Sequence, residues 1–140
     1  MISRVLVALQ FVLMILVMAR FDVSGVGPWH FIFLPAGLAV GAWALWTNRP
    51  DNINIRPEPK PGGTLVTGGP YRFVRHPMYL AVMLFSAGFV GHDPLQWLAL
   101  GALAAVLFAK ARREERLMVL AHPGYAEYRA RTRAIIPFVL

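Results

Sequence analysis

The chain has no cysteine and few charged residues. Charged residues make up 15% of its 140 positions, whereas about 25% is usual for a soluble domain. The absence of cysteine excludes disulfides, zinc–cysteine sites and cysteine nucleophiles. Acidic residues are especially scarce, with seven Asp and Glu against fourteen Lys and Arg. Hydrophobic residues make up 57% and lie in long runs, which is typical of an integral membrane protein.

The apolar runs predict one all-α membrane domain over 1–140 with about four transmembrane helices. A helix needs roughly 20 apolar residues to cross a bilayer, and about 17 is the lower end. We expect helices at about 2–19, 28–47, 74–91 and 95–120, a loop over 48–73 and a tail over 121–140. The turn signal Gly91-His92-Asp93-Pro94 makes the last two helices a hairpin. The tail is expected to form a short amphipathic helix on the membrane surface.

The distribution of basic residues predicts the orientation of the chain. With four spans, thirteen of the fourteen Lys and Arg lie on one side, and only Arg20 lies on the other. Positive charge accumulates on the cytoplasmic side, so both termini and the 48–73 loop are predicted to be cytoplasmic. The first run also resembles a signal peptide with Arg4 as its charged flank, but no small-x-small cleavage motif follows it. The net charge of +7 therefore indicates contact with anionic lipid rather than with nucleic acid.

Polar side chains are expected to gather where the third helix begins and the fourth ends. The hairpin places His76 and Pro77 beside Glu114 and Glu115. A helix start with proline in its first position offers free N–H groups to an anion. Tyrosine rings attract cations, glycines let a ligand approach the backbone, and the glutamates accept bonds from hydroxyl or ammonium groups. S-adenosylmethionine carries a carboxylate, an ammonium, a ribose and a sulfonium, so it is a chemically sensible ligand for such a site.

The order of these motifs resembles the isoprenylcysteine carboxyl methyltransferase family, which is related to the membrane phospholipid methyltransferases. The similar segments are "GTLVTGGPYRFVRHPMY", "EERLMVL" and "GYAEYRARTRAIIP", within roughly residues 60–137. The resemblance implies an integral-membrane methyltransferase that uses S-adenosylmethionine and has no Rossmann fold. Two departures lie where the methyl acceptor is expected. The segment "HPGY" is one residue shorter than the usual Phe-Gly-acid-Glu-Tyr run, and Thr132 replaces a Val or Ile.

When the family's site residues are carried over to the matching positions, the resemblance implies a cofactor site and a group of basic residues that face the substrate. The cofactor contacts are Gly63, Thr64, Leu65, Val66, Tyr71, His76, Pro77, Met78, Tyr79, Glu114 and Glu115. The substrate-facing residues are Lys110 or Arg113 near the acidic pair and Arg131 in the tail, and we take Arg113 and Arg131 as the catalytic candidates. The acceptor is a lipophilic small molecule or a lipid. A carboxylate acceptor needs an arginine to orient it, whereas an amine needs a base, for which Glu114, Glu115 or His76 is a candidate.

Two other functions also fit the sequence. One is a nicotinamide-dependent membrane reductase of the sterol-reductase type, which shares a similar terminal helical arrangement. The other is a non-enzymatic lipid-binding protein, in which Arg131 binds lipid phosphate and the glutamate pair is a solvated face. We expect no metal site, because His92 and Asp93 belong to a turn and His122 has no partner at zinc-ligand spacing. The sequence leaves open whether Arg72 or Arg75 faces a ligand.

Overall fold

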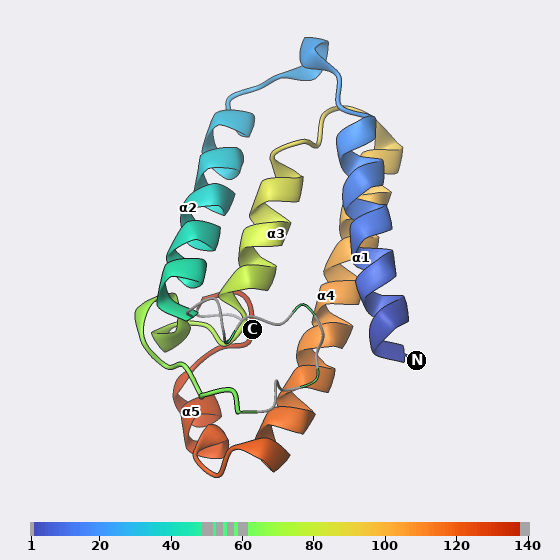
Figure 1. Cartoon of the computed structure of the whole chain (residues 1–140). Helices are drawn as coiled ribbons and strands as arrows, with labels where there is room; N and C mark the ends of the chain where they lie inside the picture. Colours follow the sequence, from blue (N-terminus) through green and yellow to red (C-terminus); the bar gives the residue numbers. More distant parts are fainter. Residues whose placement is uncertain (1, 49–51, 53–54, 56–57, 59–61, 138–140) are drawn as a thin grey trace.

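The computed structural model describes residues 2–48, 52, 55, 58 and 62–137, and these residues form an all-helical bundle without strands. Figure 1 shows the connections from α1 to α2 and from α3 to α4 at one end, and α5 with the loop before α3 at the other. The α-helices are α1 (Ile2–Ala19), α2 (His30–Asn48), α3 (Pro77–Ala87), α4 (Pro94–Ala121) and α5 (Tyr125–Arg131), with 3-10 helices η1 (Val23–Gly25) and η3 (Gly69–Arg72). The expected all-helical architecture is confirmed.

Three of the helices, α1, α2 and α4, are long and apolar enough to cross a membrane. By contrast, α3 is shorter than the helix expected over 74–91. It has 11 residues, begins at Pro77 and ends before Gly88, whose N–H bonds back to the carbonyls of the last turn. At about 1.5 Å per residue, α3 alone is shorter than the roughly 30 Å hydrocarbon core.

Residues 74–76, which were expected to begin the third helix, are not helical, because their backbone pairs with the tail. Val74 forms a parallel bridge with Arg133. The N–H groups of Arg75 and His76 donate to the carbonyls of Arg133 and Ala134 at 2.8 and 2.9 Å. This pairing joins residues almost 60 positions apart, and no local pattern in the sequence indicates it.

The helices pack in two pairs, α2 with α3 and α1 with α4, while α3 and α4 meet only sparsely. Small residues on α2 explain the first pair, because they let two helix backbones approach closely. Gly37 lies directly against α3, so that a Cβ at this position would lie 2.5 Å from the backbone nitrogen of Phe85. Since each helix has its main partner elsewhere, α3 and α4 leave space between them for a cavity.

Polar contacts join α1 to α4. The buried residues of α1 are Ser3, Gln10 and Val17, which recur every seven positions and form one stripe. The Gln10 side chain accepts a hydrogen bond from Lys110 Nζ, and Ser3 Oγ accepts one from Arg113 Nε at 2.9 Å. Polar groups inside a membrane bundle pair in this way because lipid offers them no partner. Lys110 and Arg113, which the sequence suggested would face the acceptor, therefore hold α1 in place.

The α2–α3 contact gives a first prediction. Gly37→Ala puts a methyl group against the backbone of α3 and should destabilise the bundle by about 1–3 kcal/mol, as overpacking usually does. Gly41→Ala is the matched control, because its Cβ would lie 3.5 Å from the Cβ of Ala81, an ordinary contact. Thermal unfolding in detergent micelles should show a lower Tm for the first variant alone. Equal values for the two variants would contradict this account of the packing.

Candidate functional site

A cavity opens at the end of the bundle where α3 begins and α4 ends. The empty space within it measures about 840 Å³, including open solvent at its mouth. The lining residues are Asn48, Asn52, Glu58, Gly63, Thr64, Leu65, Val66, Tyr71, Arg75, His76, Pro77, Met78, Tyr79, Glu114, Met118, His122, Tyr125 and Tyr128. Of the eleven residues expected at a cofactor site, all except Glu115 are in this set.

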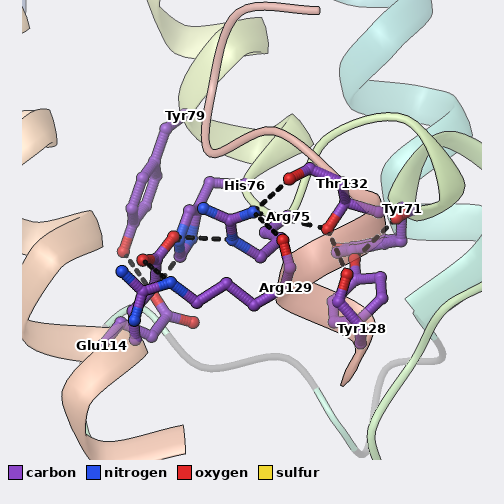
Figure 2. Close-up of polar contacts among 9 residues, drawn as sticks. Tyr71, Arg75, His76, Tyr79, Glu114, Tyr128, Arg129 and Thr132 are labelled. Atoms are coloured by element: carbon purple, nitrogen blue, oxygen red, sulfur yellow. Dashed lines mark hydrogen bonds and ion pairs between the residues drawn. The ribbon is translucent and has the colours of Figure 1, made fainter. Parts of the chain in front are cut away.

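Glu115 instead lies behind the cavity wall, where it is 4% exposed. Its Oε1 atom lies 2.7 Å from Nε of Arg75 and 3.4 Å from Nε2 of His76, and its Oε2 atom lies 3.6 Å from Nε of Arg129. Figure 2 labels these three partners, Arg75, His76 and Arg129. The expectation that Glu115 touches a ligand is not supported by this placement, because two arginines and a histidine already surround the carboxylate.

Glu114, the other half of the acidic pair, lies on the cavity wall with 31% of its side chain exposed. Tyr79 donates its hydroxyl proton to Glu114 Oε2 at 2.8 Å, and His76 Nδ1 lies 3.5 Å from the same oxygen. The rings of His76 and Tyr79 stack with centroids 5.1 Å apart and an angle of 4°. Burial opposes a charge on His76, but hydrogen bonds to the two glutamates outweigh it and raise its pKa. These contacts hold the imidazole and the phenol in fixed positions.

Arg75 connects the start of α3 to α5 and the tail. Besides its pairing with Glu115, its guanidinium donates to the backbone carbonyls of Arg129, at 3.2 Å, and of Thr132 (Figure 2). Arg72, by contrast, lies with its guanidinium 4.5 Å from the ring centroid of Phe73. Of the two arginines left open by the sequence, Arg75 is the one at the cavity.

Two tyrosines of α5, Tyr125 and Tyr128, close one wall of the cavity and were missing from the expected site. Tyr128 donates its hydroxyl proton to the carbonyl of Tyr71 at 2.6 Å, which attaches α5 to η3. The repeated tyrosine in "GYAEYRA" was a visible signal for them. The sequence did not show that α5 also contributes to the cavity wall.

Asn52 fixes the loop over 63–66. Its side-chain amide donates to the carbonyl of Thr64 at 3.0 Å, and its side-chain oxygen accepts from the N–H of Thr64 at 3.0 Å. The same amide donates to Asn48 Oδ1 at the end of α2, at 2.8 Å. A side-chain amide that bonds to both the N–H and the carbonyl of one residue sets the position of that residue. Asn48 and Asn52 therefore belong to the site, although nothing in their spacing indicated it.

The two arginines predicted to be catalytic, Arg113 and Arg131, are absent from the cavity lining. Arg113 binds Ser3 and lies 3.4 Å from Glu58 Oε1. The Arg131 side chain is 69% exposed, and its closest acidic partner is Glu127 at 3.6 Å on the same helix. Neither placement supports contact with a bound acceptor.

Comparison with known proteins gives two matches. The pattern of the isoprenylcysteine carboxyl methyltransferase (ICMT) family matches residues 31–122, about two thirds of the chain. A relative from Cupriavidus metallidurans, the cobalt-zinc-cadmium resistance protein CzcN, is 40% identical over 80 residues. These residues are 53% of this chain and 36% of the relative, so the match spans about a third of the relative's length. The family match covers α2, α3 and α4 and most of the loop and cavity residues.

The buried ion cluster gives a second prediction. Glu115→Gln leaves Arg75 buried without its carboxylate partner, which typically costs about 3–5 kcal/mol. Thermal unfolding should show a large drop in Tm. Glu127→Gln is the matched control, because its pair with Arg131 is exposed and contributes about 1 kcal/mol or less. A Tm for Glu115→Gln equal to that of Glu127→Gln would contradict the structural role of Glu115.

Proposed function

The chain belongs to the isoprenylcysteine carboxyl methyltransferase family, a family of membrane methyltransferases, and from this membership and the cavity we propose that it transfers a methyl group from S-adenosylmethionine to a lipophilic acceptor. One observation supports this most strongly. Residues from the loop, from the start of α3 and from the end of α4 line a single cavity, although up to about 50 positions separate them in the chain. They are the residue types at the spacings that the family resemblance implied.

The side chains in the cavity fit such a cofactor. Glu114 has one oxygen bonded to Tyr79, while its other oxygen has no partner among the described residues and is available to an ammonium or ribose hydroxyl. The backbone of Gly63 to Val66 can approach a ligand closely, because Asn52 holds it at the cavity wall. The ring of Tyr71 is suited to a sulfonium, since aromatic faces attract cations. The ring of Tyr79 already stacks on His76 and has Lys110 Nζ 5.0 Å from its centroid.

Methyl transfer from a sulfonium requires little chemical activation by the side chains of the protein. S-adenosylmethionine, when bound, supplies an activated methyl group, and the sulfur–carbon bond breaks with its electron pair passing to sulfur. The chain supplies position, orientation and exclusion of water. The stacked pair of His76 and Tyr79 provides a rigid wall, and Tyr79 holds Glu114 in one orientation.

We also propose that the chain crosses the membrane four times with both termini and the loop over 48–73 in the cytoplasm. The helix α3 completes the fourth crossing with its flanking residues, which is possible where backbone is covered by protein. Support comes from the position of the cavity. Its lining residues come from the loop before α3, the end of α4 and α5, and the described basic residues of these segments include Arg72, Arg112, Arg113, Arg116 and Arg129. Figure 1 shows these segments together at one end of the bundle. The acceptor then enters from the bilayer and the cofactor from the cytoplasm.

The cofactor assignment is tested by binding of S-adenosylhomocysteine. Purified protein in micelles should bind it with a Kd in the micromolar range, roughly −8 kcal/mol. Glu114→Gln should weaken binding by about tenfold or more, because a charge-assisted hydrogen bond contributes about 1.5–3 kcal/mol. Glu127→Gln, which changes an exposed glutamate of α5, should bind like the unmodified protein. Calorimetry that detects no binding to folded protein would refute the assignment, and protection by NADPH instead would favour a reductase.

A further inference from the structure

His122 is a cavity residue that neither the sequence motifs nor the proposed cofactor contacts use. It lies at the end of α4, where its N–H donates to the carbonyl of Met118 at 2.9 Å and its carbonyl accepts from Tyr125 N at 3.0 Å. Glu114, Met118 and His122 recur every four residues and all line the cavity. Glu114 and Met118 lie one turn apart on α4, and His122 is the residue that follows the helix, with an extended backbone.

The imidazole of His122 has no hydrogen bond, ion pair or ring contact within the described part of the chain. The other titratable residues of the cavity wall are Glu58, Tyr71, Arg75, His76, Tyr79, Glu114, Tyr125 and Tyr128. Arg75, His76 and Glu114 belong to the ion cluster, and Glu58 pairs with Arg113 and Ser3. Among the described cavity residues, His122 therefore has the one imidazole without a partner, and a nitrogen of a neutral imidazole can accept a proton.

The tyrosines of the cavity wall are not available as proton acceptors. Burial, with a smaller contribution from Glu114, raises the pKa of Tyr71 to about 12. Burial also raises the pKa of Tyr125 and of Tyr128 above the usual value for a phenol. Tyr79 donates its proton to Glu114 and is not free to accept one. These phenols stay protonated at neutral pH, so none of them removes a proton from an acceptor.

A carboxylate acceptor would instead need a permanent cation on the cavity wall to orient it. The cavity residues that the structure describes include one such cation, Arg75, and Glu115 and the carbonyls of Arg129 and Thr132 already occupy its guanidinium. Lys110 is buried against Gln10, and Arg113 binds Ser3. Among its described residues, the wall therefore offers an unpaired proton acceptor and no unpaired permanent cation.

We propose that the acceptor is a lipophilic amine and that His122 is the base that removes its proton. This inference rests on the proposed methyltransferase function. An alkylamine is protonated at neutral pH, and an ammonium nitrogen has no lone pair with which to attack carbon. His122 takes one proton from the ammonium, and the freed lone pair forms the nitrogen–carbon bond. The sulfur–carbon bond breaks with its electron pair going to sulfur, and the proton on His122 leaves through the open mouth.

The test uses two acceptors of equal chain length, decylamine and decanoate, with isotopically labelled S-adenosylmethionine and the full chain in micelles. The unmodified protein should methylate decylamine and not decanoate. His122→Gln should lower kcat for decylamine by about 100-fold or more with little change in KM, since general-base catalysis contributes about 10²–10⁴-fold. His92→Gln is the matched control, because His92 is an exposed histidine of the turn before α4 at the opposite end of the bundle.

Two further measurements separate a base from a structural residue. The His122→Gln rate with decylamine should rise steeply with pH as free amine becomes available, whereas the rate of the unmodified protein should depend less on pH, because its base removes the proton from the bound ammonium. Added imidazole should restore turnover to His122→Gly and leave His92→Gly unchanged. Binding of S-adenosylhomocysteine should be the same for His122→Gln and the unmodified protein, which shows that the fold and the cofactor site are intact.

Several outcomes would overturn the inference. These are unchanged kcat in His122→Gln, methylation of decanoate in preference to decylamine, and no methylation of decylamine by protein that binds S-adenosylhomocysteine. None of these outcomes contradicts the cofactor assignment. Failure of the unmodified protein to bind S-adenosylhomocysteine would instead refute the proposed methyltransferase itself, so the two failures are distinguishable.

Discussion

One buried carboxylate, that of Glu115, joins the three elements that enclose the cavity. An unpaired charge in such a position costs several kcal/mol, so the fold must bring cations to it. Arg75 and His76 come from the residues before α3, and Arg129 comes from α5. Arg75 also bonds to the tail and His76 contacts Glu114, so the pairing of this one charge links the start of α3, the end of α4 and α5. The remaining wall, the loop over 63–66, is held separately by Asn52.

The two adjacent glutamates, Glu114 and Glu115, point in different directions and have different partners. Successive residues of a helix point about 100° apart, since 3.6 residues complete a turn. Glu115 therefore faces the ion cluster while Glu114 faces the cavity, where Tyr79 orients it and leaves one oxygen available. Directly after α4, His122 adds an unpaired imidazole to the described cavity wall. The end of α4 thus supplies a structural anion and, in the proposed function, a ligand-binding anion and a base.

The sequence predicted the apolar helices and the meeting of His76 with the glutamate pair, because both follow from local composition and from the antiparallel order of neighbouring helices. It did not predict that the chain before Pro77 pairs with Arg133 and Ala134, since no local pattern encodes a bridge between distant segments. It also assigned Arg113 to the substrate. Charge alone does not distinguish an arginine that binds a ligand from one that binds Ser3 on a neighbouring helix. His122 was set aside for lack of metal-ligand spacing, a criterion that does not detect a proton acceptor.

The central claim is that one ligand contacts segments held together around Glu115. Hydrogen–deuterium exchange with and without S-adenosylhomocysteine tests it most directly. The account predicts slower exchange, on adding the ligand, in residues 62–79 and in residues 114–128 together, and no change in the turns at the opposite end, 20–29 and 88–93. Protection of one segment without the other, or protection at the opposite end, would contradict a cavity shared by the two halves of the chain.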